Sequence, residues 1–423
     1  MTGSRASNDD GTTMDSTALQ AELVTLRRTL HAYPEIGLDL PQTQRRVLDA
    51  LDGLELEIST GRHLSSVTAI LRGGQPGPAV LLRADMDALP IDEASGVEYS
   101  SRIPGAMHAC GHDLHTAMLV GAARRLAARR SELHGDVVLM FQPGEEGHDG
   151  AARMIDEGVL DAAGQRVVAA FGMHVRSHGG RRGVFAARPG TMMGGTASVS
   201  ITVRGAGGHG ALPHLARDPI TVAAEIVLAL QTQVTRRYDV FDPVVVTVGA
   251  MRAGTAANII PAQAHLDATV RTFSAATQER VAAEITRLCE GIAAAHGLTV
   301  EVAYDPGYPV TVNDPDRYDF AAATVADVLG ADRFERLEHP VAASEDFSHV
   351  LNAVPGSYLV LNAAGGDDPL TAAVNHSPQA VFDDSVLADG ALIHTELAIR
   401  ALAEHVDPPH DGEARRKELD ATR

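Results

Sequence analysis

Three long apolar runs limit the folds open to this chain, because each has the length of a β-strand and each ends in polar residues. The runs are AVLLRAD (79–85), DVVLMFQP (136–143) and VVAAFGMHV (167–175). They alternate with helical patterns such as LHTAMLVGAARRLAARR (114–130). Near-continuous apolar strands alternating with helices are typical of a covered, largely parallel sheet. The sequence therefore predicts an α/β fold with polar residues at the carboxyl ends of its strands, where such sheets bind ligands.

The middle of the chain follows a different pattern, which begins near RPGTMMGG (188–195). Alternating segments there indicate half-buried strands, and longer apolar-periodic segments indicate helices. Their order is β-α-β-β-α-β, the split unit of a ferredoxin-like sandwich. The expected elements are strands 198–205, 243–251, 263–273 and 298–305 and helices 218–239 and 275–296. The sequence therefore predicts a small α+β domain inserted into a larger α/β domain.

These changes of pattern set the expected domain boundaries. We expect the larger domain to consist of residues 17–193 and 306–406, and the inserted domain to consist of residues 194–305. The two ends, residues 1–16 and 407–423, are polar or charged, so we expect them to be disordered tails.

The composition argues against several classes of partner. Lys and Arg number 35 and Asp and Glu number 55, so the formal net charge is −20. Nucleic acid and anionic membrane surfaces both need a basic face, which makes them unsuitable partners. The two cysteines, Cys110 and Cys289, are too few for a disulfide framework. The N-terminus has no secretory signal and no apolar run approaches the ~20 residues that span a bilayer, so we expect a cytoplasmic protein with a small-molecule partner.

Five short clusters carry the residues capable of chemistry. They are RADMDALP (83–90), MHACGHDLH (107–115), QPGEEG (142–147), FGMHV (171–175) and NHSP (375–378). The potential ligands in them are Cys110, His112, Glu146, His174 and His376, with Asp85 and Asp87 of similar type. Thiolate, imidazole and carboxylate groups suit Zn, Mn, Co or Ni better than Ca or Mg. Because these groups exceed the needs of one structural site, the sequence predicts two divalent metal ions that share a bridging group.

Each cluster alone has an ordinary structural explanation. A single His after a strand is more often a satisfied core or surface residue, and a lone Cys is usually a small buried hydrophobe. The chemical interpretation depends on several such clusters meeting at the strand ends of one sheet. Glu145 and Glu146 further allow a division of roles, in which one carboxylate binds metal while the other takes a proton from water. The flanking Gly144 and Gly147 let the backbone turn tightly there.

Three residues of the inserted segment are also candidates. His209 lies in GGHGALPH (207–214), Asn258 in TAANIIP and Arg271 in ATVRTF. From the residues alone, His209 is a loop histidine and Arg271 a solvated strand residue. A functional role requires a reason to bring them to the metal ligands.

That reason comes from a family resemblance. From Leu26 (LRRTLHAYPEIG) to Asp384 (NHSPQAVFDD), the chain resembles the aminoacylase/carboxypeptidase-type metallopeptidases, in their amidohydrolase branch. Hippurate hydrolases, indole-acetyl-amino-acid hydrolases and N-acetyl-diaminopimelate deacetylases belong to this branch. The resemblance implies a phosphorylase/hydrolase-like mixed-sheet catalytic domain with helices on both faces, and an inserted ferredoxin-like domain that mediates dimerisation.

The resemblance also implies a role for each candidate. The implied ligands of a two-metal site are Cys110, His112, Glu146, His174 and His376. Glu145 matches the catalytic general base. Asp87 matches an aspartate that does not bind the metal itself but orients the residues that do. His209 matches a residue that polarises the scissile carbonyl, often across a dimer. Asn258 and Arg271 match residues that hold the free carboxylate of the substrate.

The implied activity is metal-dependent hydrolysis of the amide bond of N-acyl-L-amino acids by metal-activated water. Asp85 is not expected to be a ligand, since more distant relatives carry a metal-binding His there. Cys110 is expected to be a thiolate ligand, although one alternative makes it the nucleophile of a metal-free hydrolase with His112 or His115 as base. A second alternative is a homologue that binds metal or acyl amino acid without turnover. A homodimer is the expected assembly.

Overall fold

The computed structural model describes residues 16–366 and 368–404, and within them the chain divides into two compact units. The first unit comprises the residues up to Ala187, Asp316–Arg336 and the residues from Val354 onwards. The second unit comprises Arg188–Pro315 and Leu337–Ala353. Apart from Ser16, the two expected tails lie outside the described residues.

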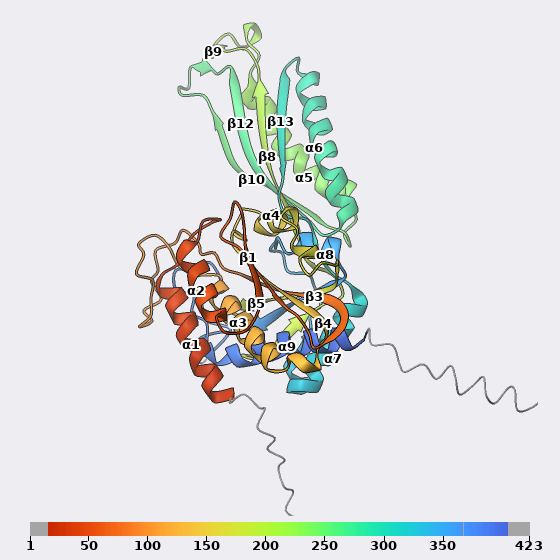
Figure 1. Ribbon diagram of the computed structural model, residues 1–423. Helices are drawn as coiled ribbons and strands as arrows, with labels where there is room; N and C mark the ends of the chain where they lie inside the picture. The colour runs from red at the N-terminus through yellow and green to blue at the C-terminus, as the bar shows by residue number, and fades with distance from the viewer. Residues whose placement is uncertain (1–15, 367, 405–423) are drawn as a thin grey trace, which may run out of the picture. The chain divides into compact units, whose positions relative to one another are not determined.

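The first unit is built on an eight-stranded mixed sheet with the strand order β1-β2-β4-β3-β5-β16-β6-β15 (Figure 1). The strands are β1 (Glu57–Thr60), β2 (Val67–Leu71), β3 (Gln75–Asp85), β4 (His134–Gln142), β5 (Val167–Arg176), β6 (Phe185–Ala187), β15 (Phe334–Arg336) and β16 (Gly356–Asn362). The four central strands β4, β3, β5 and β16 run parallel to one another. Strands β1 and β2 are antiparallel to their neighbours, so the sheet is mixed. The α/β class expected from the apolar runs is confirmed.

Burial explains why the central strands read as continuous apolar runs. Seven consecutive residues that end β3 and all seven residues of β16 are buried. Successive side chains of a strand point to opposite faces, so unbroken burial means that both faces are covered. The helices of this unit are α1 (Ser16–Ala32), α2 (Pro41–Leu51), α3 (His112–Ala128), α4 (Gly150–Asp156), α7 (Pro315–Leu329) and α9 (Leu387–Ala403). Helices α3 and α9 pack against each other and against β3.

The second unit has the β-α-β-β-α-β order expected from the sequence. Its antiparallel sheet has the order β10-β12-β8-β13, and two helices complete it. The elements are β8 (Gly195–Arg204), α5 (Pro219–Arg237), β10 (Val244–Ala253), β12 (Gln263–Thr272), α6 (Ala275–Ala295) and β13 (Thr299–Pro306). Both helices share one apolar core with the alternating buried residues of the strands. The other face of β8 and β12 is polar, which gives the strands their alternating pattern.

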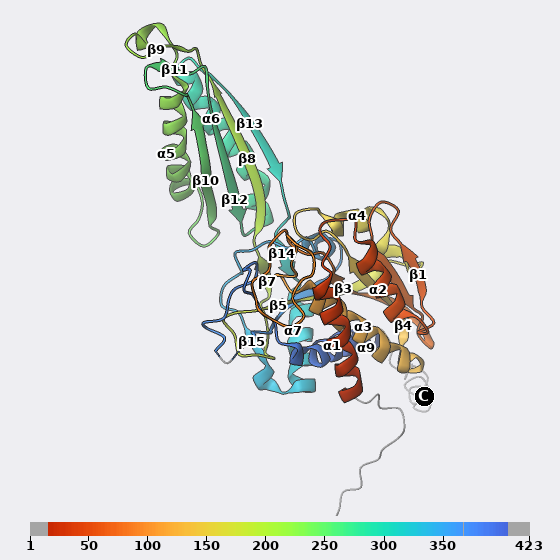
Figure 2. The same ribbon diagram turned by 90° about the vertical axis from the view of Figure 1, so that its left-hand side faces the viewer.

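Small elements complete the second unit. Strand β9 (Gly208–His209) pairs with β11 (Ile259–Ile260), and Figure 2 shows this pair at one end of the unit. Strand β7 (Gly190–Met193) pairs with β14 (Thr311–Asn313), and α8 (Ser348–Ala353) is a short helix. The second unit thus includes residues 337–353, which the sequence places in the larger domain. The expected domain boundaries themselves stay a prediction.

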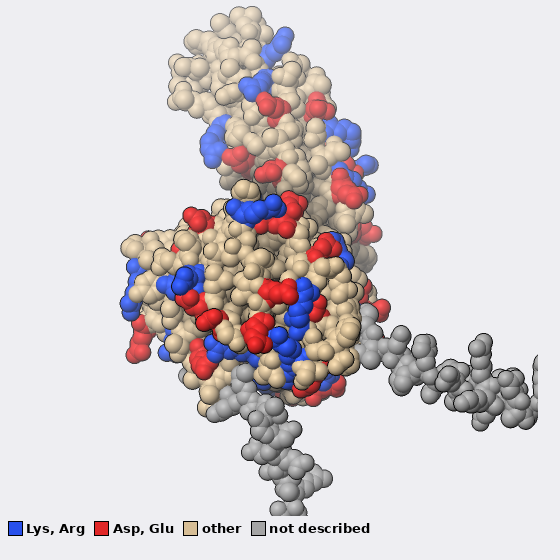
Figure 3. Space-filling model, viewed as in Figure 1, with Lys and Arg blue, Asp and Glu red and all other residues tan. Residues whose placement is uncertain are grey.

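The surface is acidic but mixed in charge. On the face seen in Figure 3, Lys and Arg side chains lie among Asp and Glu side chains. Ion pairs such as Arg45 with Asp49 and Arg204 with Glu301 join several of them. Within residues 16–366 and 368–404, none of the helices combines the length and the hydropathy that crossing a bilayer requires.

Candidate metal centre

The ligand-type residues of the first unit gather where neighbouring parallel strands end. Strand β3 ends at Asp85, β4 ends three residues before Glu145, and His174 is near the end of β5. These strands are adjacent in the order β4-β3-β5, so their carboxyl ends lie at one edge of the sheet. Helix α3 begins at His112 beside them, after Gly111 in the left-handed conformation (φ 85°).

Cys110 lies at the centre of this cluster. Its Sγ is 3.3 Å from His174 Nε2 and 3.2 Å from His376 Nε2. The second of these imidazoles lies 3.2 Å from Glu146 Oε1. The Cys110 thiol belongs to two groups of potential ligands, and within each group the ligand atoms lie within 4.8 Å of one another. One group is Cys110, His112 and His174, and the other is Cys110, Glu146 and His376. This arrangement offers ligand atoms for metal ions in two groups, with the Cys110 thiol common to both.

The buried state of His112 tests whether a metal fits here. The residue is fully buried, and neither ring nitrogen makes a hydrogen bond among the described residues, although Nε2 lies 3.6 Å from Asp85 Oδ2 and Nδ1 lies 3.5 Å from Asp87 Oδ1. An unsatisfied buried polar group costs about 1–3 kcal/mol, and these carboxylates lie beyond good hydrogen-bonding distance of the imidazole, so a closer partner would stabilise it. A divalent cation is such a partner, and sulfur, nitrogen and carboxylate donors are what Zn and similar ions prefer. The residues therefore fit a metal centre.

Charge is strongly coupled around Cys110. Burial would raise the pKa of its thiol, but the adjacent charge of His174 and the contacts with His112, His174 and His376 hold that pKa well below its usual value. Burial would lower the pKa of His174, but the thiolate raises it to about 9. Contacts with Cys110 and Glu146 raise the pKa of His376 to about 10. The thiolate is the form in which cysteine binds metal, whereas the two imidazoles must be neutral to bind, so a bound cation would replace their protons as the compensating charge.

Asp87 holds the two adjacent glutamates in place. Its Oδ1 accepts a hydrogen bond from the backbone N–H of Glu145 at 2.9 Å, and its Oδ2 accepts one from Glu146 at 3.0 Å. Gly144 and Gly147 on either side have positive φ of 74° and 79°, which produces the tight turn expected there. Ligand atoms of Glu145, Glu146 and His112 lie within 4.8 Å of one another. The turn thus presents both carboxylates to the cluster.

His115 is excluded as a base for Cys110, because both of its ring nitrogens are already used. Its Nε2 accepts a hydrogen bond from the backbone N–H of Val175 at 2.7 Å. The proton therefore sits on Nδ1, which donates to Asp85 Oδ1 at 2.5 Å. The other oxygen of Asp85 is paired with the buried Arg83 at 2.7 Å. Both oxygens of Asp85 are thus engaged by protein groups, although the carboxylate also lies within 4.8 Å of ligand atoms of His112 and His115. That Asp85 is not a ligand stays a prediction.

A buried polar network behind α3 was missed in the sequence. Asp113, which follows His112, forms an ion pair with Arg27, whose Nε lies 2.8 Å from Asp113 Oδ2, and the same oxygen lies 2.8 Å from His31 Nδ1. The second nitrogen of His31 lies 3.2 Å from Glu93 Oε1, and the Arg27 guanidinium covers the ring of Tyr99. The only signal in the sequence is the four-residue spacing of Arg27 and His31, which places them on one face of α1.

The candidate residues of the second unit lie at two separate positions in that unit. His209 is paired with Ile259, and the N–H of Gly210 donates to the Asn258 carbonyl at 2.9 Å, so His209 and Asn258 are neighbours. The His209 Nδ1 accepts from the N–H of Ala211, which leaves the proton on Nε2. Arg271 is elsewhere. It lies near the opposite end of β12, and at ~3.3 Å per residue it is about 26 Å along the strand from Gln263.

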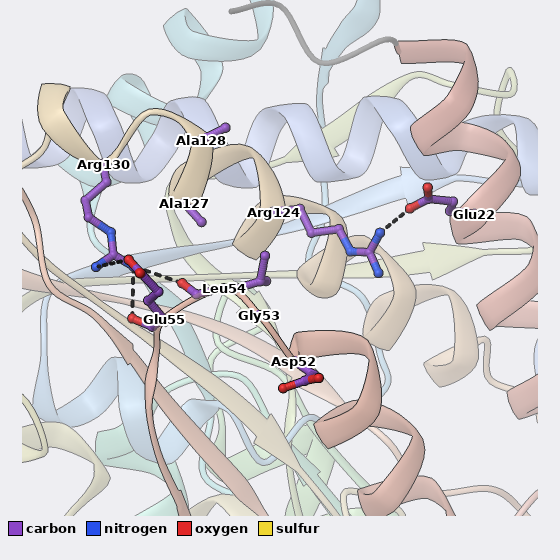
Figure 4. Close-up of a pocket in the computed structure, with 9 residues that line it drawn as sticks. All are labelled: Glu22, Asp52, Gly53, Leu54, Glu55, Arg124, Ala127, Ala128 and Arg130. Atoms are coloured by element: carbon purple, nitrogen blue, oxygen red, sulfur yellow. Dashed lines mark hydrogen bonds and ion pairs between the residues drawn. The ribbon is translucent and has the colours of Figure 1, made fainter.

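A cavity of about 590 Å³ lies apart from this cluster (Figure 4). It is lined by the C-terminal end of α3, whereas the ligands lie at its N-terminal end, about 18 Å away at 1.5 Å per residue. Its arginines are already engaged, since Arg124 pairs with Glu22 and Arg130 donates to the carbonyls of Leu54 and Glu55. The cavity therefore offers no unengaged arginine to an anionic ligand.

The fold and the cluster together define a metallohydrolase, because sulfur, imidazole and carboxylate donors meet at the strand ends of an α/β sheet. Comparison with known proteins gives the family. The chain belongs to peptidase family M20/M25/M40, whose model matches residues 81–400. The protein is thus a hydrolase of amide or peptide bonds, and the family resemblance noted from the motifs is confirmed.

Relatives in this family cover nearly all of the chain. Thermostable carboxypeptidase 2 of Saccharolobus solfataricus is 36% identical over 89% of this chain and 95% of its own. IAA-amino acid hydrolase ILR1-like 2 of Arabidopsis thaliana is 38% identical over 90% of this chain and 85% of its own. Hippurate hydrolase of Campylobacter jejuni is 35% identical over 91% of this chain and 97% of its own.

A solved structure supports the architecture. The YXEP protein of Bacillus subtilis, described as a dinuclear metal-binding peptidase, is 32% identical and matches with a TM-score of 0.79. The match covers 92% of this chain and 100% of that chain. The mixed-sheet fold with a second α+β unit is therefore confirmed.

Proposed function

We propose that the protein hydrolyses the amide bond of N-acyl-L-amino acids and releases a carboxylic acid and a free amino acid. The observation that carries this proposal is the pair of ligand groups that share Cys110, beside a glutamate pair held by Asp87. The names of the relatives support the substrate class, since IAA-amino acids and hippurate are acyl amino acids. A carboxypeptidase substrate also has a free carboxylate next to the scissile amide.

We assign the metal ligands as the sequence predicts them. They are Cys110, His112, Glu146, His174 and His376. Two divalent ions there, Zn, Mn, Co or Ni, would lower the pKa of water and polarise the amide carbonyl. The orientation of His174 supports its role, because its Nδ1 donates to the Val175 carbonyl at 2.7 Å and leaves Nε2 for a metal.

Glu145 is the proposed proton carrier. Its carboxylate takes a proton from the attacking water and delivers it to the nitrogen of the leaving amino acid. It lies beside His112 and Glu146 but is only 6% exposed, so it works away from bulk water. Asp87 keeps the glutamate turn fixed while this proton moves, through its two backbone hydrogen bonds.

The second unit supplies the proposed substrate contacts. Arg271 would pair with the carboxylate of the substrate, and His209 would donate its Nε2 proton to the carbonyl oxygen. Within one unit Arg271 is remote from His209 and Asn258, so we propose that these residues come from different subunits of a homodimer. The exposed edge strand β10 supports an assembly along that edge, where Val245 and Met251 are 47% and 43% exposed.

The test is hydrolysis of an acyl-amino-acid panel by metal-stripped protein, before and after adding Zn, Mn, Co or Ni. The panel contains hippurate, N-acetyl amino acids, indole-acetyl conjugates and N-acetyl-diaminopimelate. Activity that disappears with the metal and returns with it is the expected result. Activity that survives stripping would instead move the reaction to Cys110. Binding without product under every metal would favour the non-catalytic alternative.

A further inference from the structure

Asn375 precedes His376, and its side chain makes hydrogen bonds to the segments that carry Cys110 and His174. Its Nδ2 donates to the Cys110 carbonyl at 3.3 Å and to the Val175 carbonyl at 3.1 Å. The same nitrogen lies 3.9 Å from Cys110 Sγ. Its Oδ1 accepts from the backbone N–H of Ser177 at 2.9 Å and from the Ser177 hydroxyl at 3.0 Å.

The orientation of this carboxamide is set by its partners. Only an oxygen can accept the Ser177 N–H, and only an NH₂ group can donate to two carbonyls. Asn375 therefore uses both donors and its acceptor within the site. The Val175 carbonyl receives a second hydrogen bond from His174 Nδ1 at 2.7 Å, so the same oxygen links Asn375 to the ring of His174.

The backbone beside Asn375 needs such support. His376 has φ 69°, in the left-handed region that non-glycine residues seldom adopt. Its backbone N–H donates to the Ala109 carbonyl at 2.9 Å, next to the bond from Asn375 to Cys110. Two adjacent residues of the NHSP segment are thus tied to two adjacent residues of the MHACGH segment. Strained positions of this kind persist when the surroundings over-determine them.

We propose that Asn375 is a positioning residue of the metal centre, whose carboxamide holds the Cys110, His174 and His376 segments in the geometry that binds metal. This proposal rests on the proposed metal-dependent function and adds a residue that is not itself one of the predicted ligands. Hydrogen bonds behind the ligands typically change metal affinity ~10–100-fold. Loss of the Asn375 donors should therefore weaken metal binding before it affects the fold.

The experiment measures metal affinity rather than turnover. Metal-stripped protein is titrated with Zn(II) against a chromophoric chelator, and with Co(II) to record the thiolate-to-cobalt absorption band. Asn375→Leu removes all contacts, while Asn375→Asp keeps the acceptor for Ser177 and loses the donors. We expect both variants to bind Zn(II) about 10–100-fold more weakly and to shift or weaken the cobalt band. Ser177→Ala should stay within about twofold of the unaltered protein.

Asn362→Leu is the control, because Asn362 is an asparagine with side-chain hydrogen bonds at the end of β5, although it is fully buried and Asn375 is half-buried. Its Oδ1 accepts from the Arg176 side chain, beyond His174 on β5, and its Nδ2 donates to the Val184 carbonyl. Neither hydrogen bond reaches the Cys110 segment or the His376 segment. Equal losses at Asn362 and Asn375 would overturn the proposal, as would near-normal affinity in Asn375→Leu or Asn375→Asp. If the unaltered protein binds no metal, the proposed function fails as well. Thermal unfolding of the metal-free variants checks that they fold.

Discussion

Glu145 and Glu146 are neighbours in the chain but face different surroundings. Glu146 lies 3.2 Å from His376 and within the ligand group of Cys110. Glu145 belongs to no group that contains Cys110, although it lies beside His112. The same Asp87 carboxylate holds both backbones, so the difference arises from the side chains alone. Their proposed roles, base and ligand, can therefore be separated by substitution.

Glu145→Gln should abolish most turnover while leaving metal binding intact. An amide of the same size cannot take a proton from water, and general-base catalysis is worth about 10²–10⁴-fold in rate. We expect kcat to fall by about that factor, with metal content per chain unchanged. Steady-state kinetics on the best panel substrate and elemental analysis of the dialysed protein provide the measurement.

Glu146→Gln is the paired control for this experiment. It makes the same chemical change one residue further on, and we expect it to lose metal together with activity. A nearly fully active Glu145→Gln enzyme would show that the base is another group. Equal metal loss in the two variants would mean that both carboxylates bind metal.

At the scale of elements, the start of α3 depends on Gly111. This residue has φ 85° and precedes His112, the first residue of the helix. An added Cβ would overlap Val175 Cγ2 on β5 and come within 3.1 Å of the Phe382 ring. The glycine therefore lets α3 approach β5 closely enough for Cys110 to meet His174.

Gly111→Ala should destabilise the protein and weaken metal binding. The left-handed backbone alone costs an L-residue about 1–2 kcal/mol, and overpacking typically adds about 1–3 kcal/mol. Gly96→Ala is the matched control, since Gly96 has φ 76° but nothing within 4 Å of the added Cβ. Urea unfolding of both variants gives the comparison. Equal losses of stability would show that the contact with Val175 is unimportant.

The network behind α3 predicts a dependence of stability on pH. Burial would raise the pKa of Glu93, but hydrogen bonds with His31, Ser101 and Ser95 lower it from 4.5 to about 2. A carboxylate with a depressed folded pKa stabilises the protein above its unfolded pKa and loses that effect as pH falls. The stabilisation should therefore disappear between pH 4.5 and about pH 2.

Glu93→Gln tests this, because the amide keeps the shape and removes the charge. We expect the variant to be less stable than the unaltered protein at pH 7 and the gap to narrow as pH falls below 4.5. Free energies of unfolding in urea at pH 7, 5, 4 and 3 give the result. Glu98→Gln, at an exposed position of the same loop, should show no such gap. A gap at Glu93 that stays constant with pH would contradict the assignment.

At the scale of the whole molecule, the distance between His209 and Arg271 raises the question whether one active site uses residues from both subunits of a dimer. If a site uses His209 from the partner, two inactive variants can complement each other. A His209→Ala chain has an intact Glu145, and a Glu145→Gln chain has an intact His209. Their mixed dimer then contains one complete site of two.

Co-expression of these two chains should restore activity that neither variant has alone. With random pairing in a symmetric dimer, about a quarter of the unaltered activity should return. Adding Val245→Lys and Met251→Lys to both chains should remove the recovery and yield monomers by light scattering. If no activity returns while mixed dimers are present, His209 acts within its own subunit.

The sequence predicts the elements well, because their patterns are local. The unbroken apolar runs at 79–85 and 136–143 match the covered strands β3 and β4. The Asp-Pro at 218–219 marks the start of α5, where the Asp218 side chain accepts from Ile220 N–H. Helix α3 begins at His112 rather than Leu114, since the left-handed Gly111 opens it two residues earlier than the apolar pattern indicates.

The sequence alone determined the class of the sheet, the order of strands and helices in the second unit, and the kinds of metal-ligating side chain. These features follow from the periodicity and the residue types of short segments. Only the tertiary structure decided that His115 is fully engaged, that Asn375 ties Cys110 to Val175, and that Arg271 is remote from His209. These facts join residues far apart in the chain. They depend on how the strands and loops pack, which no local pattern encodes.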